Sequence, residues 1–188
     1  MKSFRQIITE RVQDINFLKM RFKDAEYRDV FQWMEKNARY LGSGAQGRAY
    51  TGEDGTWVCR IAEHWGAYED FIERARSMNN PLVPKVQAMF QTKDGGSVVF
   101  IEYLRIPDYN RTVRKIFKSA YLSWRDGRPP SKLVKPWLDK NGVKMDDLEE
   151  VFAVIRHIAD TSGGKIDLSS DNIGFREDGQ MVLFDPIG

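Results

Sequence analysis

Three oxygen-bearing side chains near the end of the sequence have the types and spacing that suit chemistry on a phosphate group. Asp167 and Asn172 are five residues apart, and Asp185 follows Asn172 after thirteen more. Residues 173–184 have the pattern of a strand, a Glu-Asp-Gly-Gln turn and a second strand, so we expect this hairpin to bring its two ends together. Carboxylate and carboxamide oxygens bind Mg²⁺ that also holds nucleotide phosphates. The remaining Asp can orient or deprotonate a hydroxyl.

A glycine-rich segment lies earlier in the chain. Gly42, Gly44 and Gly47 have the spacing G-x-G-x-x-G, with Ser43 between the first two. Strand and turn signals flank the segment where a dinucleotide-binding unit would begin a helix, which argues against that fold. Glycines between two strands let backbone amides approach a phosphate without side-chain obstruction. A glycine-rich hairpin turn without a ligand has the same pattern, so both interpretations stay open.

The elements that must position these residues follow from the hydrophobic periodicity. Residues 1–37 predict an N-terminal extension of two helices. Residues 38–104 predict a lobe built on a five-stranded, mainly antiparallel sheet, with the glycine-rich loop in its first hairpin and one helix after the third strand. Residues 105–188 predict a small helical lobe that contains the Asp-Asn loop and the last Asp, with Asp146 as the cap of its longest helix. The predicted fold class is therefore α+β.

Composition restricts the partners and the compartment. Of the 188 residues, 41% are apolar, which is typical of a globular chain long enough to bury a core. The single cysteine, Cys59, excludes an intramolecular disulfide and a cysteine-based zinc site. No apolar run approaches the ~18 residues of a membrane-spanning helix, and the N-terminus has no apolar signal core. We expect a soluble protein of the reducing cytoplasm without a membrane partner.

Charge is distributed unevenly along the chain. The net charge is only +2, but residues 105–144 hold eleven basic and three acidic side chains, a net charge of +8. Five aromatic residues are interleaved with them: Tyr109, Phe117, Tyr121, Trp124 and Trp137. Basic residues among aromatics indicate an anionic partner, either nucleic acid or an acidic protein surface. Two ordinary helices with solvated outer faces and a buried aromatic stripe have the same composition.

Together, these motifs resemble the protein kinase-like fold. The glycine-rich segment matches the loop that covers the nucleotide, and Val58-Cys59-Arg60-Ile61 stands in the place of the V-A-I-K strand. Phe100-Ile101-Glu102-Tyr103-Leu104 is similar to the strand that leads into the adenine-binding hinge. More narrowly, the chain resembles the early serine/threonine kinases of lytic tailed bacteriophages. Those kinases share the D-x-x-x-x-N-I loop and have Asp-Pro where most kinases have Asp-Phe, as at Asp185-Pro186 here.

The resemblance implies a bilobal fold with a truncated helical lobe, a requirement for ATP and Mg²⁺, and roles for individual residues. Asp167 would be the catalytic Asp and Arg60 the phosphate-binding cation, paired with Glu73 or Glu69 from the following helix. Asn172 and Asp185 would hold the metal. The residues implied in nucleotide binding are Gly42, Ser43, Gly44, Gly47, Ile61, Glu102 and Leu104.

Three features depart from the family pattern. Arg60 stands where the phosphate-binding Lys is expected, and an always-charged planar guanidinium is not equivalent to an ammonium. Lys165-Ile166-Asp167 replaces His-Arg-Asp, so the usual histidine support of the catalytic loop is missing. The sequence ends at Gly188, so we expect no activation segment and a substrate platform built from residues 105–162 or the N-terminal helices.

The resemblance implies a minimal ATP-dependent serine/threonine protein kinase, phage-encoded and acting on host proteins in the host-cell cytoplasm. The alternative is a pseudokinase that keeps the fold and acts as a binding or inhibitory module on a host protein or nucleic acid. The substituted Arg60 and the basic segment 105–144 favour this alternative. A small-molecule kinase related to the aminoglycoside or sugar kinases has the same Asp, Asn and Asp and stays a third interpretation.

Overall fold

The structure is a computed structural model, and it describes residues 14–44, 47–106 and 111–187. Contacts within the chain divide it into two compact units. The first holds the described residues up to Trp65 together with the segment Lys85–Tyr103. The second holds Gly66–Pro84 and the described residues from Leu104 onward. In this division the helix that follows the third strand, residues 67–77, belongs to the second unit. The sequence pattern had predicted it as part of the sheet lobe.

The first unit contains the predicted five-stranded sheet. Its strands pair antiparallel in the order β1-β2-β3-β5-β4. They are β1 (Arg39–Gly44), β2 (Gly47–Thr51), β3 (Trp57–Ala62), β4 (Val86–Gln91) and β5 (Ser97–Glu102). Gly55 and Gly95 close two of the turns with φ angles of 65° and 91°, which a residue with a side chain rarely adopts. With six α-helices in the described part of the chain, the sheet confirms an α+β fold.

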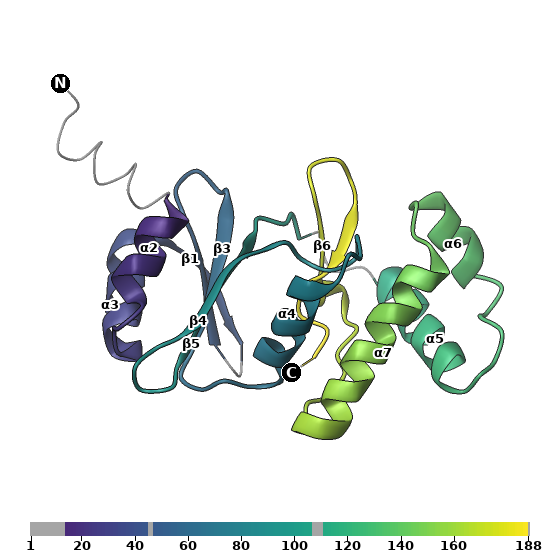
Figure 1. Cartoon of the computed structure of the whole chain (residues 1–188). Coiled ribbons are helices and arrows are strands. Elements are labelled where there is room, and N and C mark those ends of the chain that lie inside the picture. The colour runs from purple at the N-terminus through teal and green to yellow at the C-terminus, as the bar shows by residue number, and fades with distance from the viewer. Residues whose placement is uncertain (1–13, 45–46, 107–110, 188) are drawn as a thin grey trace. The chain divides into compact units, whose positions relative to one another are not determined.

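Two helices, α2 (Ile15–Phe22) and α3 (Tyr27–Asn37), pack on one face of this sheet (Figure 1). They contribute Leu18, Phe22, Val30 and Met34 to a core in which β3 places Trp57, Cys59 and Ile61. Each large apolar side chain buried in this way contributes roughly 1.5–3 kcal/mol. Because side chains alternate along a strand, Val58, Arg60 and Ala62 project from the opposite face of the sheet.

A polar contact at the edge of this core joins α3 to β2. The Tyr50 hydroxyl donates to Oε1 of Glu35 at 2.5 Å, and Arg48 lies 3.7 Å from the same carboxylate. The Arg48 guanidinium also lies over the ring of Phe31, 4.5 Å from its centre. Burial raises the pKa of Tyr50 well above its ordinary value, and the bond to Glu35 raises it further. The hydroxyl therefore stays a donor at physiological pH.

The second unit is mainly helical. Its helices are α4 (Ala67–Ser77), α5 (Arg111–Arg125), α6 (Val134–Lys140) and α7 (Met145–Ser162). Helix α5 packs against α6 and α7, and α4 packs against α7 (Figure 1). The prediction that Asp146 caps the longest helix is wrong, because Lys144 holds the capping position and Asp146 lies inside the first turn. There its negative charge is favourable next to the positive end of the helix dipole.

A short hairpin completes the second unit. It follows the 3-10 turn η1 (Ser170–Asn172) and consists of β6 (Ile173–Phe175) and β7 (Met181–Leu183). Arg105 pairs with Phe175 through two backbone hydrogen bonds of 2.9 Å each. A Cβ atom on Gly174 would lie 2.7 Å from the Cβ of Leu104, so the absence of a side chain at Gly174 lets these segments approach. No helix within the described ranges has the length and apolar character needed to cross a membrane.

The segment between α4 and β4 is held against the hairpin and α7 by two polar side chains. Arg176 donates to the carbonyl oxygens of Pro81 at 2.7 Å and Val83 at 3.0 Å. The buried amide of Asn80 donates to the carbonyl of Asp147 at 2.8 Å and to the carboxylate of Glu150 at 2.7 Å. These bonds satisfy polar groups that would otherwise be buried without partners, and they fix the C-terminal side of α4 within the second unit.

Candidate active site

Backbone pairing in the second unit brings Asp167, Asn172 and Asp185 together. The N–H of Phe184 donates to the carbonyl of Asn172 at 3.0 Å, and the N–H of Asp167 donates to the carbonyl of Pro186 at 2.9 Å. Asp185 lies between these two bonded residues, so one bond holds it near Asn172 and the other near Asp167. The side-chain amide of Asn172 also donates to the carbonyl of Asp167 at 3.1 Å. The hairpin thus brings Asp185 back to Asn172, and the bond to Pro186 adds Asp167 to the pair.

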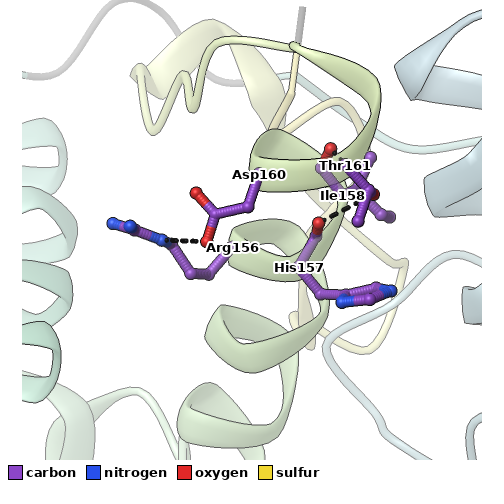
Figure 2. Close-up of polar contacts among 5 residues, drawn as sticks. All are labelled: Arg156, His157, Ile158, Asp160 and Thr161. Carbon is purple, nitrogen blue, oxygen red and sulfur yellow. Dashed lines mark hydrogen bonds and ion pairs between the residues drawn. The ribbon is translucent and has the colours of Figure 1, made fainter.

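Helix α7 leads into this loop, and its last turns carry side-chain contacts between residues four positions apart. Figure 2 shows its last turns, where Arg156 Nε lies 2.7 Å from Asp160 Oδ2 and Thr161 Oγ1 donates to the carbonyl of His157 at 2.9 Å. Gly163 then ends the helix with a φ of 72°. Ser162 Oγ donates to Asp70 Oδ2 at 2.7 Å, which ties the end of α7 to α4.

The loop between α7 and Asp167 has a support that differs from the expected histidine. Ile166 forms an antiparallel bridge with Ile187, next to the bond between Asp167 and Pro186. Proline has no N–H, but its carbonyl oxygen accepts as well as that of any residue. The chain after Asp185 therefore pairs directly with the chain before Asp167. Backbone pairing holds the loop in a protein that lacks the His-Arg-Asp sequence.

The side chains of the three residues differ in exposure and partners. Asp167 is exposed, and its Oδ1 accepts a hydrogen bond of 3.0 Å from the N–H of Ser169, which fixes the orientation of the carboxylate. Asn172 and Asp185 are both half-buried. An exposed, oriented carboxylate suits contact with an incoming hydroxyl, whereas two half-buried oxygen donors suit a metal ion.

The donor set indicates which metal would fit. Among the described residues, no three His, Cys, Asp or Glu side chains form a cluster that could hold a metal. Asp185 and Asn172 supply one carboxylate and one carboxamide oxygen, since the Asn172 nitrogen is oriented by its bond to the Asp167 carbonyl. Mg²⁺ is commonly held by one or two such oxygens together with phosphates and water. The residues therefore fit Mg²⁺ that arrives with a nucleotide.

The glycine-rich hairpin and Arg60 lie in the first unit, on the sheet face opposite α2 and α3. Gly42 pairs with Ala49, and Ala49 pairs with Arg60 on the next strand. Directly paired residues project to the same face of a sheet. The Nε atom of Arg60 lies 3.3 Å from the position that a Cβ on Gly47 would take. The Arg60 side chain therefore extends toward the base of the glycine hairpin, across a surface of small residues.

The glycines of this hairpin differ in what the fold requires of them. A Cβ on Gly47 would lie 2.7 Å from the backbone oxygen of Ile61, so β2 and β3 can pair here only with glycine. A Cβ on Gly42 or Gly44 would meet no atom of the described residues within 4 Å, and neither glycine has a positive φ. Packing thus explains why position 47 is a glycine, but neither packing nor backbone conformation explains the glycines at positions 42 and 44. Close approach of a ligand to the backbone would explain both.

Substitution by alanine should separate these two kinds of glycine. Gly44→Ala should raise the free energy of unfolding by about 0.4–1 kcal/mol, because alanine restricts the unfolded chain and fits the native conformation. The same change should weaken binding of magnesium-ATP, because the methyl group occupies the approach to the backbone. Gly47→Ala should instead destabilise the protein by about 1–3 kcal/mol through its clash with β3. Chemical denaturation with and without magnesium-ATP measures both effects, and unchanged ATP affinity in Gly44→Ala would remove the ligand explanation.

Three further residues implied in nucleotide binding have different environments. Ile61 is fully buried in the core with α2 and α3, on the face of the sheet opposite Arg60. Glu102 Oε1 accepts the N–H of Lys85 at 2.8 Å, which ties β5 to the start of β4. Leu104 is buried in the second unit against Gly174. Val58 projects from the same face of the sheet as Arg60, where Ile61 was expected. The two-residue spacing of Val58 and Arg60 along the predicted strand was the signal that could have placed Val58 on this face.

The two acids proposed as partners of Arg60 also differ from each other. Glu69 is only 1% exposed, and its Oε2 accepts the N–H of Gly66 at 2.9 Å at the start of α4. Glu73, one turn later, is exposed. Helix α4 belongs to the second unit and Arg60 to the first. An ion pair between Arg60 and either acid stays a prediction.

No protein-family model matches this chain, and a search of curated proteins finds no match. The kinase-like resemblance therefore depends on the motif residues themselves. The functional proposal depends on the geometry that the structure gives to those residues.

Proposed function

We propose that this protein is a minimal ATP-dependent serine/threonine protein kinase with a bilobal kinase-like fold, similar to the early kinases of lytic tailed bacteriophages and acting on host proteins. The observation that carries the proposal is the convergence of Asp167, Asn172 and Asp185 through the bonds at the two ends of the β6–β7 hairpin. Kinases use this set to hold magnesium-nucleotide and to orient the acceptor hydroxyl. The glycine hairpin and Arg60 of the first unit would offer a surface for phosphate groups.

In the proposed reaction, the oxygen of a Ser or Thr hydroxyl forms a bond to the γ-phosphorus of ATP. The bond between that phosphorus and the β,γ-bridging oxygen breaks, and ADP leaves with the electron pair. The hydroxyl proton passes to the carboxylate of Asp167, which the bond from Ser169 keeps oriented. Asn172 and Asp185 would hold Mg²⁺, which offsets the negative charge of the phosphates when it is bound.

Arg60 has a defined part in this proposal. Its guanidinium can form two parallel hydrogen bonds with phosphate oxygens, and it extends along the same face as Gly42 and Gly47. A hydrogen bond to a charged group contributes about 1.5–3 kcal/mol, so Arg60→Ala should weaken magnesium-ATP binding by about ten- to a hundredfold. Arg60→Lys should keep part of the affinity, because the ammonium retains the charge but not the planar fork.

A matched control is available on the neighbouring strand. Arg48 pairs with Ile61 and contacts Phe31 of α3, so it projects from the other face of the sheet. Arg48→Ala should leave ATP affinity unchanged when measured by calorimetry beside Arg60→Ala. Binding and phosphoryl transfer that survive Arg60→Ala would show that the phosphate-binding cation is a different residue.

The experiment that tests the function is transfer of γ-labelled phosphate from magnesium-ATP to proteins of a bacterial lysate. We expect label on Ser or Thr of lysate proteins, and a rise in melting temperature with magnesium-ATP because the nucleotide binds the folded state. A melting shift without any transfer would instead identify the pseudokinase alternative, which the Arg in place of Lys at position 60 favours. The absence of both effects would contradict every nucleotide-dependent interpretation.

A further inference from the structure

Helix α5 carries an exposed cationic stripe in the second unit. Arg111, Arg114, Lys115, Lys118 and Arg125 are all exposed, and their spacing places them on one side of the helix. At the C-terminal end of this stripe, Arg125 pairs with Asp126, with 2.8 Å between Nε and Oδ1. At 1.5 Å per residue, the stripe is roughly 21 Å long. The helix contains no acidic residue, whereas α3, α4 and α7 each carry both signs of charge. Figure 2 shows an ion pair within a helix on α7, where Arg156 pairs with Asp160 one turn later.

This stripe is unfavourable for the helix that carries it. Arg111 and Lys115 are like-charged residues one turn apart, and so are Arg114 and Lys118, which destabilises a helix. Both arginines also lie in the first turn, where the helix dipole disfavours positive charge. Such local conflicts with helix stability are expected where a surface serves binding. A negatively charged partner along α5 would relieve both conflicts.

Tyr109 lies outside the described residues, and the other aromatic residues of segment 105–144 pack mainly inside the second unit. Phe117 and Tyr121 are buried, and they make edge-on contacts with Trp137 and Phe152 at 5.7 Å and 5.4 Å between ring centres. Trp124 packs on the same Phe152 at 5.8 Å. Single-stranded nucleic acids are usually held by exposed aromatic platforms as well as by cations. The exposed side of α5 offers charge without such platforms, which favours an acidic protein segment over nucleic acid.

The helix that carries the stripe is a neighbour of the candidate active site. Helix α5 packs against η1, the turn that carries Asn172, and both belong to the second unit. Outside residues 105–144 the chain holds 18 basic and 24 acidic side chains, a net charge of −6. An acidic segment would therefore be repelled by much of the protein and attracted to α5.

We propose that the exposed face of α5 binds an acidic segment of the protein substrate, next to the Ser or Thr that is phosphorylated. This inference rests on the proposed kinase function and specifies its substrate class as proteins with Asp- or Glu-rich sequence beside the acceptor. The binding itself does not require ATP, so it can be measured separately from phosphoryl transfer.

The test uses fluorescence anisotropy with three labelled probes at low salt and without nucleotide. The probes are a peptide with one Ser flanked by Glu, the same peptide with Gln for Glu, and an RNA oligonucleotide of equal charge. We expect the acidic peptide to bind most tightly. The double variant Lys115→Glu with Lys118→Glu should weaken that binding by about tenfold or more, because it reverses the charge at the centre of the stripe. Lys115→Arg with Lys118→Arg should retain it.

The variants contain their own controls for folding and for net charge. The Glu replacements convert the two like-charge pairs of α5 into attractive ones, so loss of binding cannot be ascribed to loss of the helix. Lys140→Glu with Lys144→Glu changes the net charge by the same amount away from α5 and should leave peptide affinity unchanged. Equal weakening in both double variants, tighter binding of the RNA, or no preference for the acidic peptide would each overturn the proposal.

Phosphoryl transfer distinguishes failure of this inference from failure of the kinase function. Efficient transfer to both the Glu and the Gln peptide, unchanged by Lys115→Glu with Lys118→Glu, would retain the kinase and overturn the acidic specificity. Binding of the acidic peptide through α5 without any transfer would retain the surface and overturn the kinase.

Discussion

Replacing Asp167 by Asn will lower the rate of phosphoryl transfer by about 10²- to 10⁴-fold and leave magnesium-ATP affinity nearly unchanged. The carboxylate is the proposed acceptor of the hydroxyl proton, and a positioned general base contributes a factor of this size. Asparagine keeps an oxygen at the position that accepts the N–H of Ser169, so the turn after residue 167 is preserved. The rate with γ-labelled ATP and the affinity by calorimetry are measured on the same preparation.

Asp171 provides the matched control within the same loop. It is exposed and only one residue before Asn172, but it has no assigned part in the reaction. Asp171→Asn removes the same charge and should change the rate less than about tenfold, since only long-range electrostatics differ. Asp185→Asn should lower magnesium-dependent ATP affinity as well as the rate, because Asp185 is assigned to the metal. Equal loss of ATP affinity in Asp167→Asn and Asp185→Asn would contradict this division of roles.

Replacing Asn80 by Asp will destabilise the protein by about 3–5 kcal/mol at neutral pH, which is the usual cost of an uncompensated buried charge. The Asn80 side chain is 7% exposed, and its amide nitrogen donates to the Asp147 carbonyl and the Glu150 carboxylate. A carboxylate would lose both donations and place a second negative charge beside Glu150. The change is nearly isosteric, so it tests the electrostatics and hydrogen bonds and not the packing.

The loss of stability in Asn80→Asp should depend on pH in a defined direction. Burial and the nearby Glu150 would raise the pKa of the new carboxyl above its value in the unfolded chain. The folded state then binds the proton more tightly, so the destabilisation should be largest at neutral pH and should shrink as pH falls through the raised pKa. Urea denaturation of wild type and variant at neutral and mildly acidic pH measures the difference.

Asn141 offers a control of the same residue type. Its amide donates to the carbonyl of Trp137 at 2.7 Å, but the residue is exposed. Asn141→Asp should cost less than about 1 kcal/mol, because water solvates the new charge and only the end of α6 is affected. A loss of stability in Asn80→Asp no larger than in Asn141→Asp would show that the Asn80 bonds do not hold the segment between α4 and β4.

Much of the local structure is predictable from the sequence because its causes are local. Gly55 in the Glu-Asp-Gly turn and Gly95 in the Asp-Gly-Gly turn have positive φ, and the strands on either side of them form as expected. The hydrophobic spacing in residues 111–125 predicts α5 with the observed bounds. Even the proximity of Asn172 and Asp185 follows from a single hairpin, since one turn determines which residues lie at its two ends.

Tertiary structure alone decided the features that depend on partners distant in the sequence. Asn80 bonds residues 67 and 70 positions away, and no local pattern indicates those partners. The register between β2 and β3 places Gly47 against the backbone oxygen of Ile61, so packing requires a glycine there. Packing sets no such requirement at Gly44. The sequence determined that residues 105–144 are basic and aromatic. Only the meeting of α5 with α6 and α7 decided that Phe117 and Tyr121 are buried, because burial depends on which helices meet, and it leaves the cations as the exposed chemistry of α5.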